Sequence, residues 1–120
     1  MKPHYTIEFG KLVVRDTSSS SLLWSGDFDG CRVFKILPLG STEDCLVLLD
    51  PGSSTRPTFE NLLLVGPAGA VRWKAQLPQT NDAFVDVLLI GQKLEARTWN
   101  GLRVKVDVET GQTLEIGFTK

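Results

Sequence analysis

Apolar and polar residues alternate along most of this 120-residue chain, in short segments separated by frequent turn residues. In the segment 102–108, for example, Leu102, Val104 and Val106 would share one face of an extended strand. No long window repeats apolar residues at the spacing of a helix. The alternation therefore predicts an all-β protein, with strands at residues 5–9, 11–16, 22–28, 31–37, 45–49, 59–65, 71–77, 83–90, 93–98, 102–108 and 112–118.

The length of the chain fits a single domain over residues 1–120. We expect about ten or eleven antiparallel strands joined as hairpins, arranged as a sandwich or an open barrel. A chain of this size buries enough surface to fold without a disulfide or a metal ion. No apolar run approaches the ~20 residues of a membrane helix. The first residues offer no apolar segment for a signal peptide, so we expect a cytoplasmic protein.

Four segments are apolar almost without interruption, at residues 31–37, 45–49, 62–65 and 87–90. A strand that is apolar on both sides is typical of a strand covered on both faces. We therefore expect these segments to lie centrally in the fold.

Three predicted hairpin loops carry glycine in their third position, at residues 67–69, 99–101 and 109–111. A three-residue loop of this kind uses glycine in the left-handed position before a bulge. Each loop would set apolar residues opposite one another. This register predicts the pairs Ala96 with Val104, Val106 with Leu114, Val104 with Ile116, Val65 with Val71, and Leu63 with Trp73, the last with Trp73 in the core.

The segment 106–111 reads Val-Asp-Val-Glu-Thr-Gly and resembles the repeats of quinoprotein-type β-propellers. In those repeats an apolar strand enters an acidic-Thr-Gly turn, and a tryptophan follows about four residues later. Gly69 and Trp73 match this spacing, whereas Gly111 is followed by Glu115. The resemblance implies propeller-like hairpins and brings no cofactor residue. About two and a half such units cannot close a ring, which needs at least about four blades.

Six basic side chains would point outward from the predicted sheet: Arg72, Lys74, Lys93, Arg97, Arg103 and Lys105. Most of them have an acidic neighbour across the strands, since Lys105 would lie between Glu95 and Glu115. This favours a solvated face of mixed charge. Arg97 and Arg103 would face each other without a partner, and they are the candidates for binding an anion or a partner on this face.

The first half of the chain is mildly acidic, and Asp27, Asp29, Glu43 and Asp44 are its candidate partner-binding residues. We expect them to form a rim that docks onto a basic partner. The sequence Asp27-Phe28-Asp29-Gly30 resembles part of a calcium loop, but no glutamate completes it. Asp-Gly is also a common turn signal, so we expect a turn and no metal site.

Trp99 lies in a predicted hairpin loop beside Asn100 and Gly101. Tryptophan is enriched in binding hot spots, so a tryptophan at a hairpin tip can anchor a partner. Packing against the sheet edge is the alternative. The longest polar stretch, residues 51–57, is the best candidate for a mobile loop.

The chain offers few groups for catalysis, and we expect no enzymatic activity and no cofactor. His4 is the only histidine, and it lies near a chain end, where a catalytic role is disfavoured. Cys31 and Cys45 form no Cys-x-x-Cys pair with metal-ligand spacing. We expect both thiols to be reduced and buried.

The charge balance of 13 basic and 14 acidic residues argues against nucleic acid as the primary ligand. What remains is a non-enzymatic domain that binds a protein. In size and general character the chain is similar to small bacterial toxin-immunity proteins, which implies a cytoplasmic inhibitor that covers the active site of a basic toxin domain. Two alternatives stay open: a β-domain that binds peptides by sheet-edge augmentation, and a small hydrolase.

Overall fold

The computed structural model describes residues 2–40 and 42–118. It confirms the all-β fold, with eleven strands and one short 3-10 helix in the described chain. The elements are β1 (Pro3–Glu8), β2 (Lys11–Asp16), β3 (Leu22–Gly26), β4 (Val33–Pro38), β5 (Cys45–Leu49), η1 (Pro51–Ser53), β6 (Leu62–Val65), β7 (Val71–Lys74), β8 (Phe84–Ile90), β9 (Lys93–Thr98), β10 (Leu102–Val106) and β11 (Thr113–Phe118).

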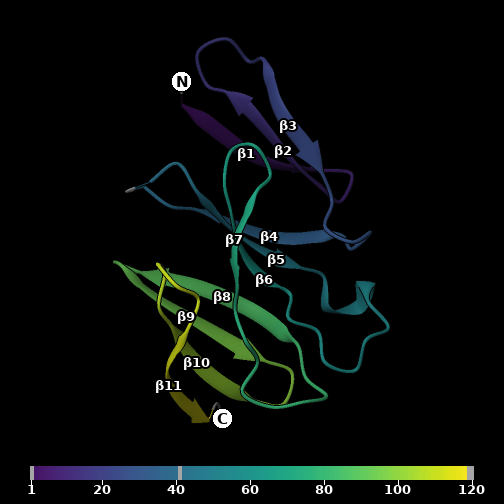
Figure 1. Cartoon of the computed structure of the whole chain (residues 1–120), viewed down its shortest axis with the longest axis vertical. Helices are drawn as coiled ribbons and strands as arrows, with labels where there is room; N and C mark the ends of the chain where they lie inside the picture. Colours follow the sequence, from purple (N-terminus) through teal and green to yellow (C-terminus); the bar gives the residue numbers. More distant parts are fainter. Residues whose placement is uncertain (1, 41, 119–120) are drawn as a thin grey trace.

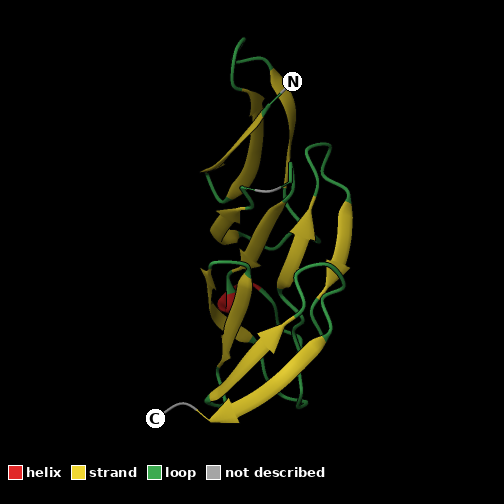
Figure 2. Cartoon of the chain, turned by 90° about the vertical axis from the view of Figure 1, so that its left-hand side faces the viewer, coloured by secondary structure: helices red, strands yellow, loops and turns green. Residues whose placement is uncertain are grey.

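The strands form three antiparallel sheets, in the orders β1-β2-β3, β4-β5-β6-β7 and β8-β9-β10-β11. Within each sheet the strands follow one another in chain order, as expected of successive hairpins. The sheets stack along the long axis of the molecule, with β1–β3 at the top of Figure 1, β4–β7 in the middle and β8–β11 at the bottom. Figure 2 shows the same succession from the side, and the stack does not close into a barrel.

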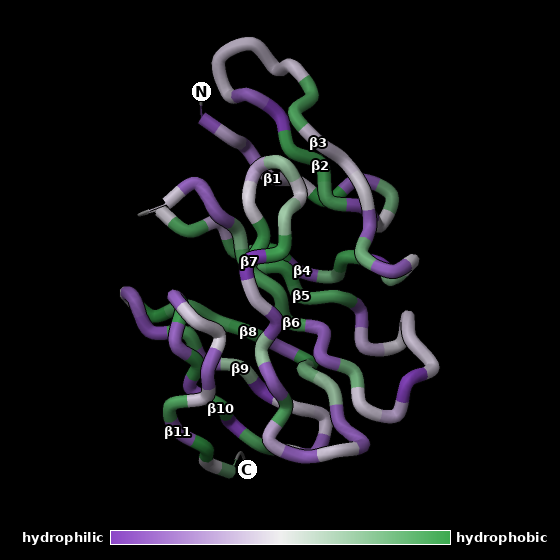
Figure 3. Tube along the Cα trace, viewed as in Figure 1, coloured by the Kyte–Doolittle hydropathy of each residue, from purple (hydrophilic) through white to green (hydrophobic). Residues whose placement is uncertain are grey.

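The two central strands of the middle sheet, β5 and β6, are covered on both faces, as their continuous apolar sequences predict. The same prediction is wrong for residues 31–37 and 87–90, because β4 and β8 are edge strands and Phe34 and Ile90 are exposed. In β5, Leu46 and Leu48 face one neighbouring sheet, whereas Val47 and Leu49 face the other. This follows from the two-residue period of a strand. All residues of β5 and β6 are buried, and Figure 3 shows green, hydrophobic chain at the centre of the stack.

Two cores therefore hold the stack together. The carboxyl-terminal core lies between the middle sheet and β8–β11, and its buried residues are Leu39, Leu46, Leu48, Leu62, Leu64, Trp73, Ala75, Phe84, Val87, Leu94, Ala96, Leu102, Val104 and Val106. The amino-terminal core lies between β1–β3 and the middle sheet, and its buried residues are Tyr5, Leu12, Val14, Cys31, Val33, Cys45, Val47, Leu49, Phe59, Leu63 and Val65.

Both cysteines lie in the amino-terminal core, free and buried, as predicted. Cys45 has no exposed surface. Burial disfavours the charged thiolate and raises the pKa of Cys45 to about 12.

The hairpin β9–β10 has the predicted register, with Val104 opposite Ala96. The hairpin β10–β11 keeps it only in part. Val104 lies opposite Ile116 as expected, but a bulge between Lys105 and Val106 sets Val106 opposite Thr113 instead of Leu114. The prediction for Leu114 is therefore wrong, because a bulge adds one residue to one strand of the ladder.

In the hairpin β6–β7, Val65 lies opposite Val71 as predicted, but Trp73 lies opposite Leu64 and not Leu63. The cause is again a bulge, between Leu64 and Val65. It leaves Trp73 in the carboxyl-terminal core, where its Nε1 donates a hydrogen bond to Val108 O at 2.8 Å. Trp73 is thus a core residue, as expected, but it lies on the face of the middle sheet opposite to that of Leu63.

Candidate binding face

Five loops meet at one end of the strands, which we call the connection end: residues 9–10, 27–32, 50–61, 75–83 and 99–101. Backbone hydrogen bonds join them in turn. Val33 N donates to Gly10 O, Asp50 N donates to Arg32 O, and Phe59 N donates to Asp82 O. The connection end is therefore one continuous surface built from all three sheets.

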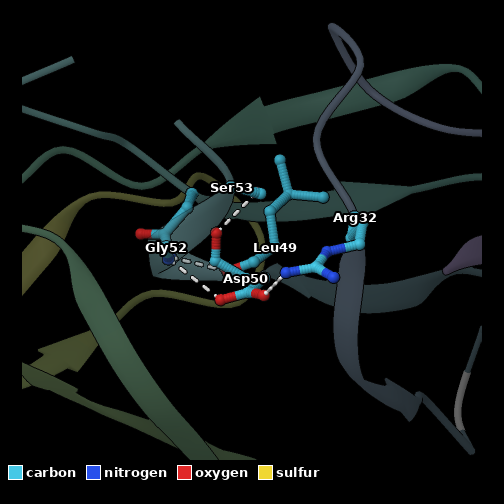
Figure 4. A network of polar contacts seen from close by, with 6 residues as sticks. Arg32, Leu49, Asp50, Gly52 and Ser53 are labelled. Atoms are coloured by element: carbon cyan, nitrogen blue, oxygen red, sulfur yellow. Dashed lines mark hydrogen bonds and ion pairs between the residues drawn. The ribbon is translucent and has the colours of Figure 1, made fainter. Parts of the chain in front are cut away.

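The longest of these loops begins at Asp50, and Figure 4 shows how its start is held. The Asp50 carboxylate accepts hydrogen bonds from Gly52 N at 2.9 Å and from Arg32 Nη2 at 2.7 Å. Ser53 Oγ donates to Asp50 O at 2.6 Å, which closes the turn of η1. The segment 51–57, predicted as a mobile loop, is thus anchored at its first turn.

A cleft of about 630 Å³ lies on one side of this loop, and we call it the acidic cleft. Asp27, Asp29 and Glu60 line it, together with the loop residues 53–56. Asp29 and Gly30 both have positive φ and form the predicted tight turn, in which Cys31 N donates to Phe28 O at 3.0 Å. This turn holds Asp29 at the rim of the cleft.

A second cleft of about 510 Å³ lies on the other side of the loop, and we call it the tryptophan cleft. Trp99 lines it at the tip of the β9–β10 hairpin, with 75% of its surface exposed. Pro51, Pro57 and Phe59 complete its apolar wall. Arg56 and Phe59 line both clefts, so the loop 51–57 is a ridge between two hollows.

Asp82 fixes the hairpin that carries Trp99. Its Oδ1 accepts hydrogen bonds from Ala83 N at 2.8 Å and from Asn100 N at 3.0 Å, and the residue is 3% exposed. Its Oδ2 is buried and has no hydrogen-bond partner among residues 2–40 and 42–118. An unsatisfied buried oxygen is uncommon in a folded protein and costly.

The predicted acidic residues do not form one rim. Asp27 and Asp29 lie at the connection end, but Glu43 and Asp44 lie beyond the other end of β4, where Leu39 N donates to Asp44 O. There Tyr5 OH donates to Glu43 O at 2.5 Å, and burial raises the pKa of Tyr5. The expectation of a single acidic rim is therefore wrong, because β4 separates the two pairs.

Arg97 and Arg103 lie opposite each other, as the predicted register requires. They are not an unpartnered pair, however, because Arg103 Nε lies 3.0 Å from Glu95 Oε1. Arg97 lies opposite Asp86 of β8. Lys105 pairs with Glu115 at 3.5 Å, so this outer face of β8–β11 is the expected surface of mixed charge.

Sequence reasoning identified Asp27, Asp29 and Trp99 but missed Arg56, Phe59 and Asp82 as their neighbours. The sequence marked the loop 51–57 only by its polarity, and the pair Asn81-Asp82 reads as an ordinary turn. Asp82 reaches Asn100 across 18 positions of the chain, and no local pattern signals such a contact.

Within residues 2–40 and 42–118, no three or more His, Cys, Asp or Glu side chains form a group that could hold a metal ion. In the same part of the chain, no helix has the length and apolar character needed to cross a membrane.

Antiparallel sheets of sequential strands, stacked face to face, place the chain in the class of β-proteins built from propeller-like blades. Within that class, the chain belongs to the family described as "Domain of unknown function (DUF7957)", whose profile matches residues 35–118. The matched segment begins in β4 and ends with β11, so it contains the second and third sheets. No curated protein matches the sequence.

Solved structures of other proteins share the fold, and two of them show how far the similarity extends. BamB from Moraxella catarrhalis, a protein of the β-propeller type, has 15% identity and a TM-score of 0.63, with 96% of this chain and 32% of that chain covered. A protein of unknown function from Bacteroides caccae has 9% identity and a TM-score of 0.65, with 97% and 40% covered. This chain thus spans well under half the length of either. The likeness supports propeller-like hairpins and gives no support to the resemblance to toxin-immunity proteins.

Proposed function

We propose that this chain is a non-enzymatic protein-binding domain whose connection end is the binding face. The observation that carries the proposal is the ridge 51–57 with a cleft on each side. A surface of this shape offers a partner two hollows to fill. Trp99, which is 75% exposed beside one of them, supplies the kind of rigid aromatic group that dominates binding energy.

The charges of the acidic cleft favour a basic segment of the partner. The exposed carboxylates of the acidic cleft are Asp27, Asp29 and Glu60, and its cations are Arg56 and Lys74. Opposite charge across an interface raises the association rate and selects the partner.

A narrower form of the proposal is that the partner is a basic bacterial toxin domain and that this chain is its cytoplasmic immunity protein. The acidic cleft supports a basic partner, and two free, buried cysteines agree with a reducing compartment. The protein-binding proposal does not depend on this narrower form.

The test is affinity capture from the native host, repeated with variants of the binding face. Trp99→Ala should weaken capture of a specific partner at least about tenfold, because it removes an exposed anchor. Ile90→Ala is the matched control, since Ile90 is 64% exposed at the opposite end of the same sheet. An equal loss of partner capture in both variants, or no loss in either, would overturn the assignment of the connection end as the binding face.

A second pair of variants tests the charge of the acidic cleft. Asp27→Asn with Asp29→Asn should reduce the association rate and its dependence on salt. Asparagine keeps the oxygen that accepts a hydrogen bond from Gly30 N, so the turn is retained. Glu43→Gln, at the other end of β4, should have no effect.

The captured partner decides the narrower form. A partner whose expression kills cells that lack this chain supports immunity, and a harmless partner excludes it. Turnover by the purified chain in a screen of hydrolase substrates would overturn the non-enzymatic proposal.

A further inference from the structure

Strand β11 is an exposed edge with an apolar face. It lies at one end of the sheet order β8-β9-β10-β11, and in Figure 1 it is the dark yellow strand that ends near the C label. Leu114, Ile116 and Phe118 are 68%, 51% and 78% exposed. Natural edge strands are usually protected by lysine, proline or a bulge within the strand, because an open edge can pair with another strand. In β11 the bulge at Leu114 is one such device, but residues 115–118 contain no lysine, proline or bulge.

The side chains of Ile116 and Phe118 continue the inner face of their sheet, whereas Leu114 is the extra residue of the bulge. Phe118 lies opposite Leu102, and Ile116 lies opposite Val104, and both residues of β10 are buried in the carboxyl-terminal core. Residues opposite each other in a ladder share a face. The middle sheet ends at the four-residue strand β7, and the exposure of the β11 side chains shows that it does not cover them.

We propose that β11 pairs antiparallel with β11 of a second copy of this chain, with Ile116 on the two-fold axis. In that register Leu114 lies opposite Phe118 of the second copy, and the two apolar strips become one continuous face. A register shifted by one residue would set apolar residues opposite Glu115. It would also turn the apolar strip of one copy to the opposite face of the sheet from that of the other copy. An interface between identical strands has to be self-complementary, and this register meets that condition.

The charges on the other face also match. Glu115 lies opposite Gly117 of the second copy in the same register. Arg103 lies over Gly117, with Nη2 3.6 Å from the point that a Cβ atom there would occupy. Within one chain, Arg103 pairs with Glu95 and Lys105 pairs with Glu115. The dimer brings Glu115 of each copy beside Arg103 of the other and so joins these pairs across the two chains. An antiparallel pairing centred on Glu115 would instead oppose two carboxylates, which is unfavourable.

The first test is the mass of the full chain in solution, measured by sedimentation over a wide range of concentration. We expect a concentration-dependent dimer. Ile116→Lys sets two like charges opposite each other at the axis and removes apolar contact, so it should raise the dimer dissociation constant by at least about tenfold. Ile90→Lys, on a residue that is also more than half exposed but lies at the other edge of the sheet, should leave the dissociation constant unchanged.

Cross-linking tests the register. Ile116→Cys places the new thiols opposite each other, so mild oxidation should produce a covalent dimer. Leu114→Cys is the matched control on the same face of the same strand, and it should cross-link poorly alone but well when mixed with Phe118→Cys. The native cysteines are buried and do not compete.

Three results would overturn the proposal. They are a monomer at every concentration, a dimer unaffected by Ile116→Lys, and cross-linking of Leu114→Cys alone in preference to Ile116→Cys. A monomeric chain that instead binds a synthetic extended peptide along β11 would also replace the second copy as the occupant.

Discussion

The two faces of the middle sheet bury different kinds of residues. The carboxyl-terminal core is rich in leucine, contains Phe84 and joins the two sheets that the family profile spans. The amino-terminal core contains both cysteines and Tyr5, and it joins the middle sheet to a sheet of only three strands that lies outside the profile. The middle sheet and β8–β11 thus form a two-sheet unit, and β1–β3 covers its remaining face.

A buried polar contact also strengthens the junction between the middle sheet and β8. Asn61 is completely buried and joins the middle sheet to β8, because its Nδ2 donates to Leu49 O and Phe84 O and its Oδ1 accepts from Phe84 N. A fully satisfied buried amide fixes how two sheets meet. The comparison predicts that β1–β3 opens more readily than β8–β11.

Matched leucine truncations should show the largest effect. Leu12 of β2 and Leu94 of β9 are 0% and 1% exposed, one in each core. Each change to alanine should cost about 2–5 kcal/mol, since a buried leucine leaves a cavity. We expect Leu94→Ala to lower the global free energy of unfolding and Leu12→Ala to act mainly on β1–β3, as measured by hydrogen exchange.

The comparison fails if both variants lower exchange protection equally in all three sheets. The stack would then unfold as a single cooperative unit.

Removal of the Asn61 side chain should have the next largest effect. Asn61→Ala leaves two carbonyl groups and one N–H group without partners in a dry site, which should cost about 2–3 kcal/mol. Chemical denaturation would measure the loss. Asn100→Ala, at an exposed amide, is the control, and its effect should stay within about 0.5 kcal/mol.

The cysteines provide a probe of the weaker core. Cys45 is buried with a pKa of about 12, so in the closed protein it should resist thiol reagents at pH 8. Its labelling requires the amino-terminal core to open. Leu12→Ala should therefore speed labelling at least about tenfold, because each 1.4 kcal/mol lost from local stability is a factor of ten in the open fraction.

Leu94→Ala is the control for this labelling, and it should change the rate much less. If Leu94→Ala accelerates labelling as strongly as Leu12→Ala, the two cores do not open separately.

The sequence predicts the local features of the fold better than it predicts the long-range ones. The number of strands, the central position of β5 and the register of β9 with β10 follow from alternation and turn glycines, which are local signals. The bulges in β6–β7 and β10–β11 were missed. The bulge in β6–β7 places Trp73 on the face where its Nε1 donates a hydrogen bond to Val108 O. These two residues lie 35 positions apart, and no local pattern encodes such a contact.

The candidate site shows the same division. Asp27, Asp29 and Trp99 were identified by residue type and by their positions in turns. Their arrangement around the ridge 51–57 depends on how three sheets stack, since the turn of Asp29 follows β3 and Trp99 follows β9. Glu43 and Asp44 have the same chemistry as Asp27 and Asp29, and only the direction of β4 separates them.

The smallest expected effect concerns an ion pair that joins the middle sheet to β8–β11. Lys35 Nζ lies 2.8 Å from Asp86 Oδ1, and this hydrogen bond lowers the pKa of Asp86 below its ordinary value of 3.8. A depressed carboxylate pKa contributes stability above the ordinary pKa, which is lost as the pH falls through the lower value of the folded state. The effect should be small, because both side chains are more than a third exposed.

Thermal unfolding of the chain and of Asp86→Asn between pH 7 and pH 2 would measure it. We expect the wild-type chain to be slightly more stable at pH 7, and the difference to shrink as the pH falls and Asp86 becomes protonated. Glu8→Gln is the matched control, because the pKa of Glu8 is also lowered, by a hydrogen bond from Arg15 inside the first sheet. Only Asp86→Asn should increase hydrogen exchange in β8, since only that pair bridges two sheets. Equal exchange in β8 for the two variants would mean that the ion pair adds nothing to the carboxyl-terminal core.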